Sequence, residues 1–207
     1  MIPSTVRTRS LWVIALGTLA FAVLAWQVHS GGVLSQFDQV ITGWMQGHRN
    51  PILQAPMFLV TDMHDTGGIA IMGLLIGALL ARQRRWRAYS FLAVSVGGGM
   101  LLNVALKLVF ERSRPVFDVP LISLSTYSFP SGHAAGSTLL YMSAFIVFAQ
   151  TRWRHRLMAI GCTMVLLTAF SRVYLGAHYL SDVVAGVCVG LVWVHACRLL
   201  LDTSLRD

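Results

Sequence analysis

The sequence is poor in charged residues. Only 12% of its 207 residues are charged, whereas 56% are hydrophobic, and the mean hydropathy is +0.66. Soluble domains carry about 25% charged residues, so this scarcity excludes an ordinary soluble domain and favours a helical membrane protein. The sequence also lacks internal repeats, low-complexity tracts and interdomain linkers. We therefore expect a single integral-membrane domain over residues 1–207.

Cysteine is scarce too, and its placement excludes two kinds of site. Cys162, Cys188 and Cys197 lie in apolar stretches, and three cysteines without a Cys-x-x-Cys spacing predict neither a disulfide framework nor a zinc site. The net charge of +8 is compatible with nucleic-acid binding, but the arginines form short clusters between apolar runs, without a basic face that carries interleaved aromatic residues. We expect no nucleic-acid partner, because membrane topology explains the arginines better.

Six apolar runs are candidates for membrane-spanning helices. A helix needs roughly 20 residues to cross a hydrocarbon core of about 30 Å, and the second run is short but has Asp65 and Thr66 to cap its start. The first run is longer than the roughly 7–15 apolar residues of a signal peptide, so we expect an uncleaved helix. The sequence predicts an all-α fold, a six-transmembrane helical bundle, with spans at Leu11–Val28, Gly67–Ala81, Tyr89–Phe110, His133–Ala149, Leu157–Tyr174 and Val183–Leu201.

The segment Gly31–Asp65, between the first two spans, has a different pattern. Its apolar residues recur mostly at spacings of three or four, with polar groups between them, as in Leu34, Phe37, Ile41, Trp44 and Met45. This spacing predicts an amphipathic helix that lies along the membrane interface. A helix packed against the outside of the bundle would have the same pattern, and both interpretations stay open.

Positive charge is distributed unevenly over the connections between the predicted spans. Cytoplasmic connections carry an excess of lysine and arginine. If both termini are cytoplasmic, the cytoplasmic segments hold Arg7, Arg9, Arg82, Arg84, Arg85, Arg87, Arg152, Arg154, Arg156, Arg198 and Arg206. The outer side keeps Arg49, Arg112 and the cations of three polar motifs. These motifs then share one outer face, at the end of the third span, the start of the fourth, and between the fifth and the sixth.

The first polar motif is Lys107…Arg114-Pro115, in which Pro115 helps to end the third helix. Arg114 can bind two phosphate oxygens with its planar guanidinium, and Lys107 adds a compact positive charge. Two fixed cations suit a dianion such as phosphate. Taken alone, this motif has an alternative interpretation, in which both cations only extend to the membrane surface.

The second motif, Pro130-Ser131-Gly132-His133, predicts a turn followed by the start of a helix. Ser131 is a natural N-cap, Gly132 lets the backbone approach a ligand closely, and the free N–H groups of the first turn form an anion site. His133 follows in the first helical turn, where a histidine could donate a proton to a leaving oxygen, a role that needs a group of its kind. The alternative is a simple helix cap with a histidine at the membrane surface.

The third motif, Ser171-Arg172…His178…Asp182, is the most specific. A spacing of four residues lets Asp182 bind one imidazole nitrogen of His178, which leaves the other nitrogen free to attack. This predicts His178 as a nucleophile that forms a phosphohistidine, which water later hydrolyses. Arg172 adds a third cation for the transition state, and Ser171 either donates a further hydrogen bond or caps backbone carbonyls. Taken alone, a His-x-x-x-Asp pair is more often structural.

Together the motifs resemble the signature of the type 2 phosphatidic acid phosphatase (PAP2) superfamily, Lys-x6-Arg-Pro, Pro-Ser-Gly-His and Ser-Arg-x5-His-x3-Asp, without a departure at any position. The resemblance implies a metal-independent reaction without a cofactor, which agrees with the absence of a carboxylate cluster in the sequence that could hold magnesium. It implies catalytic roles for His178, His133 and Asp182, and a phosphate site made of Lys107, Arg114, Ser131, Gly132, Ser171 and Arg172.

The resemblance further implies a lipid phosphate or diphosphate as substrate, in the bacterial inner membrane, with the site facing the periplasm. Substrates of similar bacterial proteins include undecaprenyl diphosphate, phosphatidylglycerol phosphate, phosphatidic acid and lipid A phosphates, and we put undecaprenyl diphosphate first. A lipid phosphotransferase would use the same phosphohistidine, and a non-enzymatic lipid transporter would place its charges nearer the bilayer midplane. Vanadate-dependent haloperoxidases share the signature but are soluble and larger. The sequence leaves the oligomeric state open.

Overall fold

The computed structural model describes residues 3–122 and 124–201, and all regular secondary structure within these ranges is helical. The all-α fold predicted from the sequence is confirmed. The helices are α1 (Ser4–His29), α2 (Val33–Gly47), α3 (Pro51–Met63), α4 (Thr66–Arg82), α5 (Trp86–Ala93), α6 (Gly99–Phe110), α7 (Gly132–Val147), α8 (Arg154–Tyr174) and α9 (Leu180–Leu200). A π-helical turn, Val94–Gly98, joins α5 to α6, so that Trp86–Phe110 is one continuous helical run.

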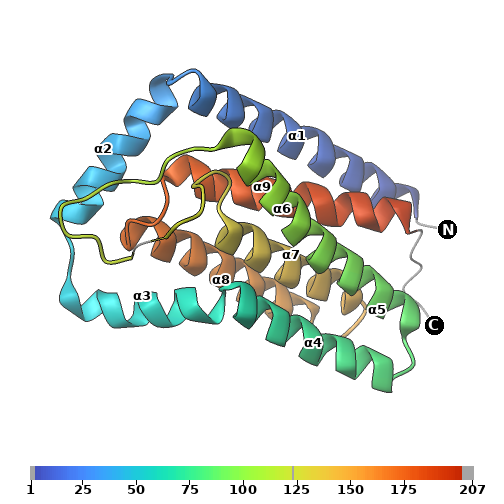
Figure 1. Ribbon diagram of the computed structural model, residues 1–207. Helices are drawn as coiled ribbons and strands as arrows, with labels where there is room; N and C mark the ends of the chain where they lie inside the picture. Colours follow the sequence, from blue (N-terminus) through green and yellow to red (C-terminus); the bar gives the residue numbers. More distant parts are fainter. Residues whose placement is uncertain (1–2, 123, 202–207) are drawn as a thin grey trace.

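Helix α7 lies at the centre of the bundle (Figure 1). It packs against α4, α6, α8 and α9, and α1 packs against α9 in turn. Helix α9 approaches α7 closely because two glycines of α9 face it. A Cβ atom at Gly186 would lie 2.5 Å from the carbonyl oxygen of Ser131, and one at Gly190 would lie 2.7 Å from Cβ of Thr138. The start of α7 is therefore held tightly against α9.

Each predicted span coincides with a helix or helical run, but their lengths differ. By length and composition, α1, Trp86–Phe110, α8 and α9 are able to cross a membrane, and α3 with α4, bent by 55°, make a fifth span if the pair counts as one. Helix α4 has 17 residues, with Asp65 accepting from the Gly68 N–H at 2.6 Å as its predicted cap. Helix α7 has 16 residues, fewer than the roughly 20 that a span needs. The count of six spans therefore stays a prediction.

The segment between α1 and α4 forms two helices, where the sequence pattern indicated one. Asn50 caps α3 and Pro51 occupies its first position, so a new helix begins there. Helix α2 is the helix of the amphipathic pattern. It turns Ile41 and Met45 towards the core of the bundle, which fits the packed interpretation. The opposite side of α2 exposes the apolar residues Val33, Phe37, Val40 and Trp44. The location of α2 at the membrane interface stays a prediction.

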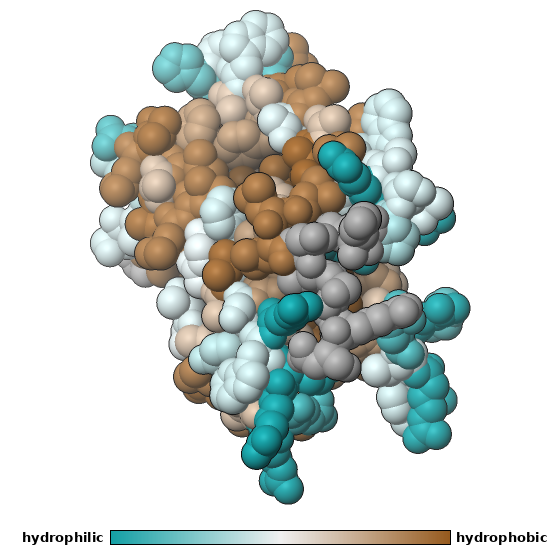
Figure 2. Space-filling model, turned by 90° about the vertical axis from the view of Figure 1, so that its right-hand side faces the viewer, coloured by the Kyte–Doolittle hydropathy of each residue, from teal (hydrophilic) through white to brown (hydrophobic). Residues whose placement is uncertain are grey.

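The two ends of the bundle differ in charge. Helix α1 begins and α9 ends at one end, whereas the connection 111–131 between α6 and α7 lies at the other (Figure 1). The arginine-rich connections from α4 to α5 and from α7 to α8 lie at the first end, and Figure 2, which looks onto that end, shows hydrophilic side chains around it. The arginine-rich connections are thus opposite the three polar motifs, as the sequence predicts.

Candidate active site

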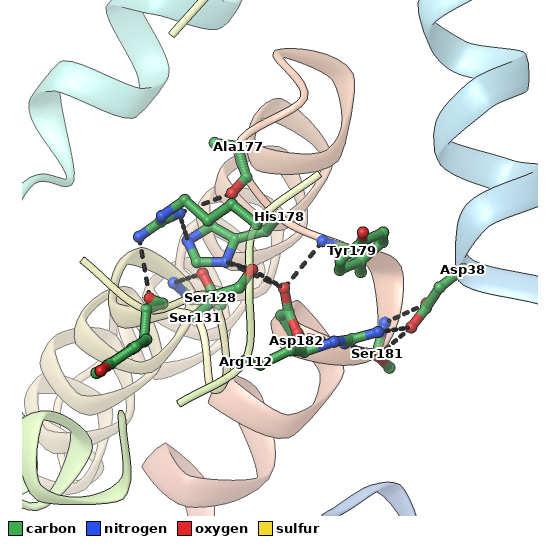
Figure 3. A network of polar contacts seen from close by, with 12 residues as sticks. Asp38, Arg112, Ser128, Ser131, Ala177, His178, Tyr179, Ser181 and Asp182 are labelled. Carbon is green, nitrogen blue, oxygen red and sulfur yellow. Dashed lines mark hydrogen bonds and ion pairs between the residues drawn. The ribbon is translucent and has the colours of Figure 1, made fainter. Parts of the chain in front are cut away.

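The three motifs meet beside the start of α7, and Figure 3 shows Ser131 of the second motif close to His178 and Asp182 of the third. Arg114, in the connection after α6, donates from Nη1 to Nε2 of His178 at 3.2 Å. The backbone N–H of Ser131, which precedes α7, donates to the carbonyl oxygen of Asp182 in α9 at 2.9 Å. One hydrogen bond thus joins the first motif to the third, and another joins the second motif to the third.

His178 lies in the turn between α8 and α9 and is 1% exposed. Its Nδ1 lies 3.3 Å from Oδ2 of Asp182, and its Nε2 faces a guanidinium that can donate and cannot accept. The hydrogen bonds therefore assign the proton to Nδ1 and the lone pair to Nε2. Burial lowers the pKa of His178 to about 3; the negative charge of Asp182 opposes this shift, and the positive charges of Arg172 and Arg114 add to it. Near neutral pH the ring is neutral, and Nε2 is able to act as a nucleophile.

Both cations of the first motif are held by oxygens of residues 126–128. Lys107 donates from Nζ to the carbonyl oxygen of Tyr127 at 2.5 Å and to that of Ser128 at 3.3 Å. Arg114 donates from Nε to the carbonyl oxygen of Thr126 at 2.7 Å and from Nη2 to its hydroxyl at 2.9 Å. Burial lowers the pKa of Arg114, but a guanidinium stays charged. Both cations are thus fixed at the site by hydrogen bonds.

Arg172, in the last turn of α8, is 2% exposed. Its Nη1 donates to Oγ1 of Thr61 in α3. Its Nε and Nη2 are buried and have no hydrogen-bond partner among the described residues. A buried charge with unpaired donors is costly, and two oxygens of one phosphate would satisfy these donors together. Arg172 therefore has two donors suited to an anionic ligand.

The second motif has the local structure that the sequence predicts. Ser131 caps α7, since its Oγ accepts from the N–H of Ala134 at 3.5 Å. Gly132 allows α6 to lie close, because a Cβ atom there would be 3.3 Å from Oδ1 of Asn103. His133 follows in the first turn of α7 and is half-buried. The first turn of α7 thus lies beside α6.

Ser171 differs from the other predicted site residues. Its Oγ donates to the carbonyl oxygen of Thr168 at 2.7 Å, within α8. Of the two interpretations of Ser171, the structure shows the one in which the hydroxyl caps a backbone carbonyl.

Comparison with known proteins adds an independent observation. Residues 88–206, which hold all three motifs, match the PAP2 superfamily. The chain belongs to the PAP2 superfamily. The resemblance of the motifs is confirmed, and the chain is a hydrolase and a multi-pass membrane protein.

Several known proteins are similar to this chain. Phosphatidylglycerophosphatase B from Bacillus subtilis is 32% identical over 180 residues, which cover 84% of this chain and 87% of the relative. Undecaprenyl-diphosphatase BcrC from the same organism is 27% identical over 150 residues, which cover 70% and 73%. The crystal structure of a transmembrane PAP2 type phosphatidylglycerolphosphate phosphatase from Bacillus subtilis gives a TM-score of 0.82 at 28% identity, over 91% of this chain and 96% of that chain.

Some polar residues of this PAP2 site were not predicted from the sequence. Ser128 donates to Oδ2 of Asp182, and its Oγ lies 3.4 Å from Nδ1 of His178. Its position just before the second motif is a signal that would have indicated it. Thr61 in α3 accepts from Arg172, and Asp38 in α2 accepts from Arg112, which in turn donates to Asp182. Both residues lie far from the motifs in the sequence, and no local pattern connects them to the site.

Proposed function

We propose that this PAP2 protein is a metal-independent phosphatase of membrane lipids that works through a phosphohistidine on His178. The proposal rests on the environment of Nε2 of His178. The imidazole is buried and neutral, and Nε2 lies 3.2 Å from Nη1 of Arg114. Arg172 has two buried donors without partners in the described ranges. A phosphate bound by these cations would present its phosphorus to Nε2. In the described part of the chain, no group of three or more His, Cys, Asp or Glu side chains could hold a metal ion, and we assign charge neutralisation to the cations.

The proposed reaction has two steps. In the first, Nε2 of His178 attacks phosphorus, the bond between phosphorus and the leaving oxygen breaks, and His133 gives a proton to that oxygen. Asp182 stabilises the positive charge that develops on the imidazole. In the second, His133 takes a proton from water, the water oxygen attacks phosphorus, and the phosphorus–nitrogen bond breaks to release phosphate. The phosphoryl oxygens are bound by Lys107, Arg114, Arg172 and the first N–H groups of α7 after Ser131 and Gly132.

Three features support a lipid substrate at the outer face of the bacterial inner membrane. Helix α2 exposes an apolar side close to the site. The arginine-rich connections lie at the opposite end, which the positive-inside rule assigns to the cytoplasm together with both termini. An apolar cavity of about 610 Å³ lies between α4 and the run Trp86–Phe110, and it has room for part of a hydrocarbon chain. A chain with six spans and cytoplasmic termini has its three motifs on the periplasmic side of the membrane.

Phosphate release by the purified, detergent-solubilised chain tests the proposal. The substrates are undecaprenyl diphosphate, phosphatidylglycerol phosphate and phosphatidic acid, with EDTA present and His178→Ala as the control. We expect release that the substitution abolishes, and the ranking of the three lipids identifies the headgroup. Release that stops in EDTA would contradict the metal-independent reaction. Transfer of a labelled phosphoryl group to an added lipid, without release, would support a phosphotransferase, and lipid transport retained by His178→Ala would support a transporter.

A Gly97→Leu variant tests whether the cavity holds the hydrocarbon chain of the substrate. Gly97 lines the cavity, and a Cβ placed there meets no neighbouring segment of the described chain within 4 Å, so a leucine side chain starts in open space on the cavity side. We expect the KM for long-chain phosphatidic acid to rise roughly tenfold, because overfilling a packed apolar site costs about 1–3 kcal/mol. The KM for dihexanoyl phosphatidic acid should change little.

The matched control is Gly43→Leu in α2, where a Cβ atom also has no described neighbour within 4 Å. Gly43 does not line the cavity, so its substitution should leave both KM values unchanged. Equal increases for the long-chain and the short-chain substrate in Gly97→Leu would contradict this use of the cavity.

A further inference from the structure

A buried carboxylate on α2 is connected to the catalytic pair (Figure 3). Asp38 is 2% exposed. Its Oδ2 accepts from Nη2 of Arg112 at 2.8 Å and from the hydroxyl of Ser181, and its Oδ1 accepts from the backbone N–H of Ser181 at 2.9 Å. Within residues 3–122 and 124–201, the hydrogen bonds of this carboxylate thus lead to the connection after α6 and to the start of α9.

Arg112 connects Asp38 to Asp182. Its Nη1 donates to Oδ1 of Asp182 at 2.5 Å and to the Ser181 hydroxyl at 2.7 Å, and its guanidinium lies 4.2 Å from the ring centroid of Tyr179. The other oxygen of Asp182, Oδ2, faces Nδ1 of His178 at 3.3 Å. Asp182 therefore uses Oδ2 for His178, for the Ser128 hydroxyl and for the backbone N–H of Tyr179, and Oδ1 for Arg112. Asp38 holds the opposite side of Arg112.

The charges in this chain of contacts alternate. Arg112 lies between two buried carboxylates, Asp38 and Asp182. Removing the negative charge of Asp38 would leave Arg112 paired with Asp182 alone, so that the arginine would draw the carboxylate charge away from His178. The guanidinium would also lose one of the contacts that orient it, and its bond to Oδ1 is one of the contacts that orient Asp182.

We propose that Asp38 is a positioning residue of the reaction, which acts through Arg112 to hold Asp182 in the orientation that His178 requires. The inference rests on the proposed phosphohistidine reaction. Asp38 lies outside residues 88–206, the part of the chain that matches the PAP2 superfamily. Helix α2 is therefore part of the catalytic apparatus and contributes more than a surface against the membrane.

Asp38→Asn is the first test, because asparagine keeps the shape of the side chain and an oxygen that accepts from the Ser181 N–H. We expect kcat to fall roughly 10–100-fold, as is typical when a partner that orients a catalytic group is lost. KM should stay within about twofold, because Asp38 does not touch the substrate. A variant with unchanged kcat and raised KM would overturn the proposal.

The matched control is Thr42→Val, one turn further along α2. Thr42 is as deeply buried as Asp38, and its hydroxyl donates to the Asp38 carbonyl oxygen. The substitution removes a buried hydrogen bond from the same face of α2 without touching Arg112. We expect wild-type kcat, whereas a loss equal to that of Asp38→Asn would show that any disturbance of α2 is sufficient and would overturn the specific role of Asp38.

A double-mutant cycle of Asp38→Asn with Arg112→Gln tests whether Asp38 acts through Arg112. If Asp38 acts through Arg112, Asp38→Asn will lower kcat little further in the Arg112→Gln background. Independent, multiplying losses would overturn the proposal. Should Asp38→Asn fail to fold, Arg112→Lys takes its place: lysine keeps the charge but cannot bridge Asp38 and Asp182 with a planar fork, and the same fall in kcat is expected.

A measurement that needs no turnover separates failure of this inference from failure of the proposed reaction. In the full chain labelled with ¹⁵N-histidine, the Nδ1–H resonance of His178, assigned by its loss in His178→Asn, reports the hydrogen bond to Asp182. We expect this resonance to shift in Asp38→Asn and to stay in place in Thr42→Val. An unshifted resonance in Asp38→Asn would overturn the positioning role, even if the wild-type chain proves to be an active lipid phosphatase.

Discussion

His178→Ala is expected to lower phosphate release by about 10⁴-fold or more, because removing a nucleophile that acts together with its catalytic partners eliminates nearly all of their joint effect. The residual rate would come from binding and from the cations. A fluorescent assay of inorganic phosphate with a diphosphate lipid measures the loss. Near-normal turnover would rule out His178 as the nucleophile.

The fold of the variant has to be measured as well, because the ring of His178 is buried and lies against Arg114. Truncation to alanine leaves a space beside a cation, so a second variant, His178→Asn, retains more of the side chain while lacking an imidazole. Both variants should keep the melting temperature within a few degrees and lose activity to the same extent. His48→Ala, at the exposed end of α2, is the control histidine and should keep full activity.

Rapid quenching with a phosphate-labelled lipid distinguishes the covalent route from direct attack by water. A phosphorus–nitrogen bond survives alkali and breaks in acid, so the wild-type chain should carry label with that stability. His178→Ala should carry none. Label that survives acid, or label retained by His178→Ala, would place the covalent bond on another residue.

Much of the architecture could be predicted because it is encoded locally. Apolar runs of sufficient length mark helices, and the cap of α4 by Asp65 and of α7 by Ser131 is readable from a few consecutive residues. The distribution of arginine predicts which connections share an end of the bundle, since alternating helices return the chain to the same side. This is why three motifs that are separate in the sequence could be assigned to one face.

The remaining parts depend on tertiary contacts. Asp38 accepts from Ser181, 143 residues away, and no spacing rule connects the two positions. Whether the Ser171 hydroxyl faces a ligand or the carbonyl of Thr168 depends on its rotamer, which the sequence does not specify. The length of α7 is also set by packing: because this helix is surrounded by others, its apolar residues face protein, and apolarity alone does not mark its ends.

Arg172→Lys is expected to lower kcat by roughly 10²–10³-fold although the charge is retained, as happens when one donor to a developing oxyanion is lost. The guanidinium is oriented by its Nη1 bond to Thr61, which leaves Nε and Nη2 as the pair of donors for two phosphate oxygens. An ammonium group on a flexible stem cannot make the anchoring bond and both phosphate bonds with the same geometry. The measurement is kcat and KM on the preferred lipid of the panel.

Helix α8 offers a matched control in Arg154→Lys, the same substitution at the opposite and exposed end of the helix. That variant should be fully active, which would show that the effect of Arg172→Lys belongs to the site.

Thr61→Val separates the charge of Arg172 from its orientation. The guanidinium stays but its hydrogen bond to Thr61 is lost, and we expect a fall in kcat smaller than that of Arg172→Lys. Full activity of Arg172→Lys would show that Arg172 is structural, and the phosphate would then have to be held by Lys107, Arg114 and the first N–H groups of α7.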